Sequence, residues 1–311
     1  MKYTTIGYSK RKVSQIGLGT WQYSSGWGYG EEYTKEDAIR IIHQAIDSGI
    51  NLIDTAEAYG FGESERVIGE AIKGYEREDI IITTKFFPMA LRSSAVERAL
   101  KKSLGRLQTS YIDIYLIHWP NPFRYVSFLR KMEEFVDEGL IRNIGVSNFS
   151  QARLKKAQSK MKKQKIQVNQ VNYSLVKNKP EIKLIPYAEK EQIKIMAYSP
   201  LAQGWLTGKY TLETKSPKGV RRRNRVFRKK NMKRGTFLLS TLKEIAKNYQ
   251  VSVSQVALNW IIRNPVVIAI PGAKSVEQVQ SNVAAADFEL SAQDVNRIEE
   301  AQKNFNPKLF F

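Results

Sequence analysis

Cysteine is absent from this chain of 311 residues, and histidine occurs only at His43 and His118. A chain without cysteine has no disulfides, no thiolate nucleophile and no cysteine metal site. Two histidines are also too few for a histidine-rich zinc site, so we expect no bound metal ion. Any catalytic chemistry must therefore come from other side chains or from an organic cofactor.

Long apolar runs are missing as well. No window reaches the ~18 apolar residues that a membrane-spanning helix needs. Residues 1–12 contain no apolar stretch long enough for a secretory signal peptide. We therefore expect a cytoplasmic protein that does not contact membranes.

Acidic residues are far fewer than basic residues in this sequence. The sequence has 50 Lys and Arg against 30 Asp and Glu, which gives a formal net charge of +20. This charge fits anionic partners such as nucleic acid, a membrane surface or a phosphorylated ligand, without choosing among them. Residues 218–234 hold ten of the basic residues and no acidic one. Because no aromatic platform or nucleic-acid-binding module accompanies this run, we expect no specific nucleic-acid partner.

Short β-branched runs alternate with helical segments along the chain. The strand-like runs occupy residues 15–19, 50–54, 80–85, 112–117, 141–147, 166–172, 193–198 and 266–270. Segments with helical apolar spacing follow at residues 38–46, 63–72, 95–107, 123–136, 151–161, 181–189, 237–249 and 276–285. Eight strand–helix units favour parallel strands with right-handed crossovers, and eight such strands close a barrel.

An open doubly wound sheet is the main alternative to a barrel. Its usual fingerprint, GxGxxG after the first strand, is missing because residues 17–22 read Gly-Leu-Gly-Thr-Trp-Gln. We therefore predict an α/β fold, with a single (β/α)8 TIM barrel domain over residues 1–311. An N-terminal β-hairpin is expected at residues 2–14, and extra helices near the C-terminus at residues 254–263 and 290–301.

Four polar side chains mark the ends of strand-like runs. Asp54, Lys85 and His118 each close a run, and Tyr59 follows Asp54 in the next loop. In a barrel of parallel strands, the carboxyl ends converge on one rim, where the chemistry is done. Aspartate, tyrosine, lysine and histidine on one rim can transfer protons, so we predict these four residues to be catalytic.

Six separated blocks of this sequence resemble the aldo-keto reductase family, and together they cover nearly the whole chain. The blocks are residues 53–69, 104–120, 139–149, 170–174, 197–210 and 270–275. The first reads Ile-Asp-Thr-Ala-Glu-Ala-Tyr-Gly at residues 53–60, and the second ends in His-Trp-Pro at residues 118–120. The resemblance implies a (β/α)8 barrel with a nicotinamide cofactor extended over its carboxyl rim. It also implies NADPH-dependent reduction of aldehyde or ketone carbonyls to alcohols.

The chemistry of carbonyl reduction suits the four predicted catalytic residues. It needs a hydride at carbon, which the cofactor supplies, and a proton at oxygen. Tyrosine has a pKa of roughly 10, and a cation that stabilises its phenolate makes it a better acid. We expect Lys85 to be this cation, Asp54 to hold the ammonium, Tyr59 to donate the proton, and neutral His118 to orient the carbonyl. The resemblance implies the same roles.

The resemblance also implies a cofactor site for NADP(H). It assigns Ser147, Asn148 and Gln170 to the carboxamide, Tyr198 to the nicotinamide ring, Ser199, Leu201 and Gly204 to the pyrophosphate, Lys274 and Ser275 to the adenosine ribose, and Gln278 and Asn282 to adenine. A lysine near the ribose can pair with a 2′-phosphate, which favours NADP over NAD.

Aromatic residues in the predicted rim loops indicate an apolar pocket for a small-molecule carbonyl substrate. These aromatic residues are Trp21, Trp27, Tyr29, Phe86, Phe87 and Trp119. Of them, Trp21, Trp27, Phe86 and Trp119 are the predicted substrate-binding residues. The tail at residues 305–311 could fold over the rim or extend into solvent. The sequence identifies neither the physiological substrate nor an oligomeric state.

Two other readings of the sequence stay open. One is a nicotinamide-binding regulatory subunit without relevant turnover, against which the intact set of four residues argues. The other concerns the basic run at residues 218–234, which could be plain solvated surface. Because it follows the seventh strand, next to the expected pyrophosphate segment, we expect it instead to retain the bound cofactor.

Overall fold

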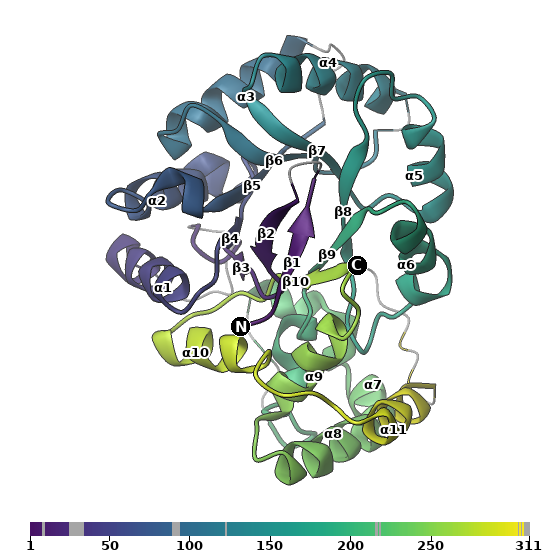
Figure 1. Cartoon of the computed structure of the whole chain (residues 1–311). Helices are drawn as coiled ribbons and strands as arrows, with labels where there is room; N and C mark the ends of the chain where they lie inside the picture. Colours follow the sequence, from purple (N-terminus) through teal and green to yellow (C-terminus); the bar gives the residue numbers. More distant parts are fainter. Residues whose placement is uncertain are drawn as a thin grey trace.

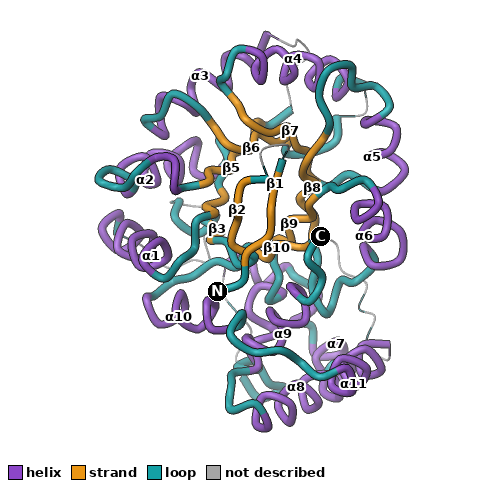
Figure 2. Tube along the Cα trace, viewed as in Figure 1, coloured by secondary structure: helices purple, strands orange, loops and turns teal. Residues whose placement is uncertain are grey.

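The computed structural model describes residues 1–7, 10–24, 34–88, 94–121, 123–214, 217, 219–303, 305 and 307. Within these residues, eight parallel strands form one sheet in sequence order. The strands are β3 (Leu18–Gly19), β4 (Leu52–Asp54), β5 (Ile81–Phe86), β6 (Ile112–Ile117), β7 (Ile141–Ser147), β8 (Ile166–Asn172), β9 (Lys194–Tyr198) and β10 (Val267–Ala269). Figure 2 shows them as an inner ring with the helices outside.

The first and last strands of the sheet meet and close it into a barrel. Parallel bridges join Ile16 to Ala269 and Gly19 to Gly272, and Gly17 N donates to Ala269 O at 2.8 Å. A Cβ at Gly19 would lie 2.9 Å from the backbone oxygen of Ile270, so this close approach requires a glycine. The predicted (β/α)8 barrel is confirmed.

The N-terminal hairpin crosses one end of the barrel, the near end in Figure 1. Its strands β1 (Tyr3–Ile6) and β2 (Arg11–Ser14) pair antiparallel. Ile6 and Val13 of the hairpin belong to one apolar cluster with strand residues such as Leu52, Ile114 and Ile268. The hairpin therefore covers the apolar interior of the barrel at the end away from the strands' carboxyl termini. Residues 8 and 9 of its turn lie outside the described part.

Helices surround the barrel, and most of them pack on its outer face (Figure 1). They are α1 (Lys35–Asp47), α2 (Glu63–Ala71), α3 (Ser94–Leu107), α4 (Tyr125–Asp137), α5 (Gln151–Gln158), α6 (Pro180–Lys190), α8 (Thr236–Asn248), α9 (Val253–Ile262), α10 (Val276–Ala284) and α11 (Ala292–Lys303). None of the described helices is long and apolar enough to span a membrane.

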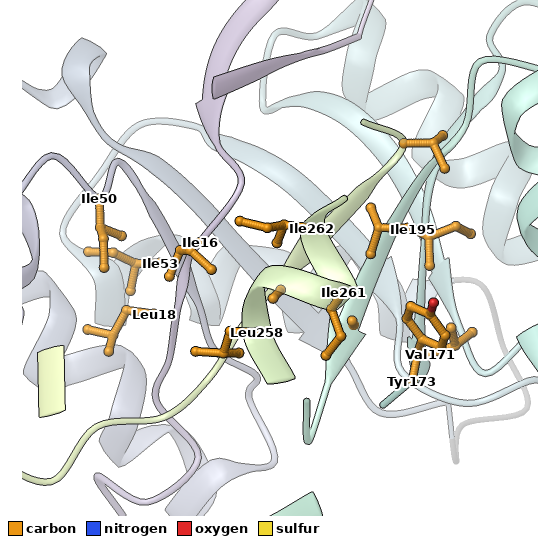
Figure 3. Packing of buried hydrophobic residues seen from close by; sticks show 14 of the residues in the cluster. Ile16, Leu18, Ile50, Ile53, Val171, Tyr173, Ile195, Leu258, Ile261 and Ile262 are labelled. Atoms are coloured by element: carbon orange, nitrogen blue, oxygen red, sulfur yellow. The ribbon is translucent and has the colours of Figure 1, made fainter. Parts of the chain in front are cut away.

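A large apolar core fills the space between the strands and the helices. Figure 3 shows a part of it where Ile16, Leu18 and Ile53 of the sheet region and Leu258 and Ile261 of α9 lie near one another. The alternation of the strands creates this core because successive side chains point to opposite faces of a sheet. One face supplies this outer core, and the other supplies the barrel interior.

The long connection after β9 contains short elements that the sequence pattern did not predict. They are η3 (Ala202–Thr207), η4 (Gly219–Arg223), η5 (Arg225–Phe227) and α7 (Lys229–Arg234). The described part of the C-terminal tail packs against this connection. Phe305 is buried and stacks on Trp205 with ring centroids 5.1 Å apart, so this residue of the tail does not extend into solvent.

Candidate active site

The structure brings the four predicted catalytic residues together. Asp54 ends β4, Lys85 lies near the end of β5, His118 follows β6, and Tyr59 begins η1 (Tyr59–Gly62). Lys85 Nζ donates to Asp54 Oδ2 at 2.8 Å and to Tyr59 Oη at 3.4 Å. The rings of Tyr59 and His118 are 5.8 Å apart in a T-shaped arrangement. Three neighbouring strand ends and one loop thus supply a compact polar group on the carboxyl rim.

Asp54 and Lys85 form a buried ion pair in which each partner has further hydrogen bonds. The Lys85 ammonium also donates to Thr55 O at 2.6 Å. Asp54 Oδ1 accepts from Gln170 Nε2 at 2.6 Å, so both carboxylate oxygens are used. Buried charges persist when they are paired and hydrogen-bonded in this way. Burial raises the pKa of Asp54 and lowers the pKa of Lys85, and each change is opposed by the other partner.

The pKa of Tyr59 differs from the sequence-based expectation. We expected Lys85 to make the phenol more acidic. Instead, burial raises the pKa of Tyr59 well above its usual value, and the Asp54 carboxylate raises it further. The reason is that the charge of Lys85 is neutralised by Asp54 at 2.8 Å, so little net positive charge remains to offset desolvation. Tyr59 therefore keeps its proton at neutral pH, as a proton donor must.

His118 is neutral, as expected. Burial lowers its pKa from 6.5 to about 3, and the nearby Lys85 ammonium contributes. Its Nδ1 atom is buried with no hydrogen-bond partner among the described residues. The ring lies between aromatic neighbours: Phe87 is T-shaped to it at 5.8 Å, and Trp119 is stacked at 6.2 Å.

The residues predicted for the nicotinamide end lie on the three strand ends that follow. Asn148 Nδ2 donates to Ser147 Oγ at 3.0 Å and to His118 O at 3.2 Å. Tyr198 Oη donates to Asn148 Oδ1 at 2.9 Å, and Ser147 Oγ donates to Gln170 O at 3.0 Å. These hydroxyl and amide groups, beside the half-buried ring of Tyr198, fit a flat ring that carries a carboxamide.

The segment predicted for the pyrophosphate has an unusual backbone. Ser199, Ala202 and Gln203 have φ values of 50°, 49° and 57°, and Gly204 has a φ of 95°. Left-handed conformations cost non-glycine residues roughly 1–2 kcal/mol each and cluster at ligand-binding segments. Leu201 is half-buried within this turn. The concentration of strained residues here fits a segment shaped to hold a ligand.

The residues predicted for the adenosine end gather at the start of α10. The Ser275 side chain accepts from Gln278 N and caps the helix. Gln278 Oε1 accepts from Lys274 N at 2.8 Å, and Asn282 is buried one turn further on. A helix N-terminus favours a phosphate group, which is consistent with the prediction for Lys274. The contacts of these residues with a cofactor stay predictions.

The four predicted substrate residues do not all lie on the rim. Trp119 is exposed beside His118, and Trp21 is half-buried in the loop after β3. Phe86 is not on the rim: it is 3% exposed and packs against Phe128 in the outer core, with ring centroids 5.3 Å apart. The cause is strand alternation, since Lys85 points to the rim and the next residue points outward. Trp27 lies outside the described residues.

Phe87 takes the place on the rim that Phe86 does not occupy. Its ring contacts His118 and is 41% exposed. Phe61 and Phe123, in the loops after β4 and β6, are more exposed still. The aromatic residues of these loops were the sequence signal for an apolar pocket. The register of the strand decides which of two neighbouring rings faces the site.

The basic run is folded against the predicted pyrophosphate segment. Arg221 is only 8% exposed, and its Nη1 atom donates to Tyr210 Oη at 3.0 Å. Asn224 Nδ2 donates to Gln203 Oε1 at 3.1 Å, which joins this run to the strained turn. The run is therefore not a uniformly solvated surface, although Arg222 and Arg223 are exposed. Among the described residues, no group of three or more His, Cys, Asp or Glu is arranged to hold a metal ion.

Comparison with known proteins finds a family model, relatives and solved structures that this chain resembles. The model of the aldo/keto reductase family matches residues 15–303. The chain is 45% identical to an uncharacterized oxidoreductase of Mycobacterium tuberculosis, covering 99% of this chain and 94% of that protein. It is 32% identical to an Escherichia coli protein named an NADH-specific methylglyoxal reductase, covering 96% and 98%. An aldo-keto reductase of Klebsiella pneumoniae, crystallised with NADPH, is similar with a TM-score of 0.81 and 32% identity, covering 99% and 97%.

Proposed function

The chain belongs to the aldo/keto reductase family, and from this premise we propose that it reduces aldehyde or ketone carbonyls with NADPH and that Tyr59 donates the proton. The observation that carries the proposal is the convergence of Asp54, Tyr59, Lys85 and His118 on one rim. Each side chain then has a part in the reaction that its environment favours.

Tyr59 suits the role of proton donor. Its raised pKa keeps the phenol protonated until negative charge develops on the carbonyl oxygen. Loss of the proton would place a phenolate 3.4 Å from the Lys85 ammonium. This cation then stabilises the charge that appears only as the reaction proceeds, which is where stabilisation accelerates catalysis. Asp54 and Thr55 O hold the ammonium in position.

The cofactor supplies the hydride when it is bound. Ser147, Asn148 and Gln170 would hold its carboxamide, and the Tyr198 ring would stack on its nicotinamide. His118 stays neutral at physiological pH because its pKa is about 3. A neutral imidazole in this position can donate a hydrogen bond to the carbonyl oxygen and orient the substrate. The rings of Phe87 and Trp119 flank His118 and would shield part of this contact from water.

We also propose that NADPH is preferred over NADH. Lys274 supports this preference because its ammonium would pair with the 2′-phosphate. The name of the E. coli relative shows that the family includes an NADH-specific member, so the preference needs its own test. Steady-state kinetics with both cofactors should give a lower KM for NADPH, and Lys274→Met should reduce the difference. Equal KM values for the two cofactors would contradict this part of the proposal.

The first experiment is the Tyr59→Phe variant. It removes only the phenolic hydroxyl, so turnover of an activated aromatic aldehyde should fall by several orders of magnitude while NADPH still binds. Tyr3→Phe is the matched control, since it removes a hydroxyl from the hairpin on the opposite end of the barrel. Tyr59 would not be the main donor if the variant kept more than about a tenth of wild-type turnover.

The same assay decides between an enzyme and a regulatory subunit. A regulatory subunit would bind NADPH, measured by quenching of protein fluorescence, and would turn over no member of a panel of aldehydes and ketones. An enzyme would consume NADPH with at least one of them. The wild-type protein is therefore assayed for both binding and turnover before any variant is interpreted.

A further inference from the structure

Glu57 lies in the turn between β4 and Tyr59, and the roles described above do not use it. Its backbone N donates to Lys85 O at 3.1 Å. Its carboxylate Oε1 accepts from the backbone N of Phe87 at 2.5 Å. One residue thus bonds to both sides of Phe86, at the place where β5 ends.

These two bonds continue the pairing of β4 with β5 beyond the strands. Thr55 N donates to Thr83 O at 2.8 Å, and Glu57 N to Lys85 O two residues later. Parallel strands bond at such even spacing. The Glu57 carboxylate then supplies an acceptor at Phe87, one residue past the end of β5. The side chain therefore fixes a loop position that the strands themselves no longer hold.

Phe87 connects this bond to the active site. Its ring is T-shaped to the His118 ring at 5.8 Å, with an interplanar angle of 85°. His118 is in turn T-shaped to Tyr59 at 5.8 Å. Phe87 is still 41% exposed, so it leaves a free apolar face on the rim. Glu57 consequently links the turn that precedes Tyr59 to Phe87, whose ring contacts His118.

The hydrogen bond from Phe87 N to Glu57 depends on an acceptor oxygen more than on a negative charge. Burial raises the pKa of the Glu57 carboxyl, the Phe87 N–H opposes this change, and the charge of Glu65 adds to it. The carboxyl and carboxylate forms both carry an oxygen that can accept from Phe87 N. Glutamine carries the same oxygen at the same distance from the backbone, which makes Glu57→Gln a matched variant of Glu57→Ala.

We propose that Glu57 is a positioning residue that holds Phe87 against His118 and so fixes the apolar wall of the substrate site. This inference rests on the proposed carbonyl reduction. The wall favours carbonyl compounds with an aromatic or bulky apolar group beside the C=O. Small aldehydes present little apolar surface to this wall and depend on it far less.

The position of Phe87 can be measured without turnover. The chain has only two histidines, so the imidazole signals of isotope-labelled His118 are readily assigned in NMR spectra, and His43 is the internal reference. Phe87→Ala defines the His118 chemical shifts without the ring. Glu57→Ala should move the His118 shifts toward those of Phe87→Ala, whereas Glu57→Gln should leave them near wild type. The His43 signals should not change.

Kinetics with two aldehydes then test the consequence for substrates. Losing one positioning bond should raise KM for an aromatic aldehyde about tenfold in Glu57→Ala, with a much smaller change for acetaldehyde. Glu57→Gln should restore the aromatic KM. Because Glu57 acts through Phe87, the Glu57→Ala/Phe87→Ala double variant should be no worse than Phe87→Ala alone. A purely structural role would instead affect both aldehydes and lower the melting temperature.

The outcomes separate this inference from the proposed function. Unchanged His118 shifts in Glu57→Ala, or additive KM losses in the double variant, overturn the role of Glu57 while carbonyl reduction stands. An inactive wild-type protein overturns carbonyl reduction, and the NMR shifts still decide whether Glu57 positions Phe87. A loss in Glu57→Gln equal to that in Glu57→Ala also overturns the role, because the acceptor oxygen is then not what matters.

Discussion

At the scale of single residues, the ion pair behind Tyr59 is the most sensitive part of the site. We predict that Lys85→Met strongly lowers turnover because it removes the cation 3.4 Å from the phenol. Without that cation the phenolate is harder to form, so any residual pH–rate profile should change shape. The measurement is kcat/KM as a function of pH. A near-normal rate with an unchanged profile would mean that Lys85 does not act on Tyr59.

The Lys85→Met variant needs a control for stability. Removing one partner of a buried pair leaves the other charge unpaired, which costs about 3–5 kcal/mol. The Asp54→Asn/Lys85→Met double variant removes both charges and should recover much of the lost unfolding free energy. It should not recover turnover. This contrast separates the chemical role of the ammonium from its structural one.

The shifted pKa of His118 predicts a dependence of stability on pH. The folded chain keeps His118 neutral down to about pH 3. In the unfolded chain, where its pKa is 6.5, His118 already binds a proton between pH 6.5 and about pH 3. The unfolding free energy therefore decreases as pH falls below 6.5, by at most ~1.4 kcal/mol per pH unit from this residue. His118→Gln lacks this contribution. Urea denaturation between about pH 7 and about pH 5 should show a shallower decline for the variant than for wild type, and parallel declines would contradict the prediction.

Strand ends made the grouping of the four proposed catalytic residues predictable from the sequence, whereas the directions of the other side chains were not. Asp54, Lys85 and His118 each follow an apolar run, so parallel topology alone brings them to one rim. The pKa of Tyr59 was predicted in the wrong direction, because it depends on burial and on the mutual neutralisation of two other residues. Phe86 was wrong by one position, since a strand end does not reveal by itself which neighbour turns inward. The bond of Glu57 to a backbone N–H leaves no pattern in the sequence.

At the scale of elements, the connection after β9 should act on cofactor affinity. Arg221 is buried and serves structure, so the test uses the exposed Arg222, Arg223 and Arg228. Changing these three to Gln should weaken NADPH binding more than NADH binding, because NADPH carries the additional phosphate. The difference should shrink as salt rises, since exposed charges are screened beyond ~10 Å at about 0.1 M salt. Fluorescence titration at several salt concentrations measures it.

Helix α5 offers a matched control for total charge. Lys155 and Lys156 in α5 and Lys160, two residues past its end, are exposed, and none has an ion pair within the described part of the chain. Changing these three to Gln removes the same charge from another face of the barrel. If both triple variants weaken NADPH binding equally, the effect comes from the net charge of +20 and not from the connection after β9.

The long helices and the strands were predictable, and the short elements of this connection were not. Apolar spacing over ten or more residues identifies helices such as α1 and α8. The short η3 contains Gln203 and Gly204 in left-handed conformations, and no periodic pattern of apolar residues predicts such a turn. The connection is shaped instead by tertiary contacts, such as Trp205 on Phe305 and Tyr210 on Phe227.

At the scale of the whole molecule, stability and chemistry lie on opposite ends of the barrel. The hairpin end is fixed by Asp113, which is 2% exposed at the start of β6. Its Oδ1 accepts from Arg11 of the hairpin at 2.5 Å, and its Oδ2 accepts from Arg77 at 2.7 Å and from Ile82 N at 3.0 Å. One carboxylate therefore joins the hairpin to three other parts of the chain.

We predict that Asp113→Ala lowers the unfolding free energy by about 3–5 kcal/mol, because it leaves the arginines and the Ile82 N–H without their acceptor. Arg11→Met should cost less, about 1.5–3 kcal/mol, since Asp113 keeps its other two bonds. Hydrogen exchange should accelerate in the hairpin of Arg11→Met and stay slow in β5 and β6. Arg142→Met is the control, because Arg142 is 3.9 Å from the carboxylate and more exposed. It should cost less than Arg11→Met.

The same variants test whether the two ends are independent. The four proposed catalytic residues lie at the carboxyl ends of the strands, and residues at the other end of such barrels serve stability. Below its lowered melting temperature, Arg11→Met should therefore keep kcat within about twofold of wild type. Urea denaturation and steady-state turnover on the same preparation measure both quantities. A large loss of kcat at unchanged unfolding free energy would show that the hairpin is coupled to the rim.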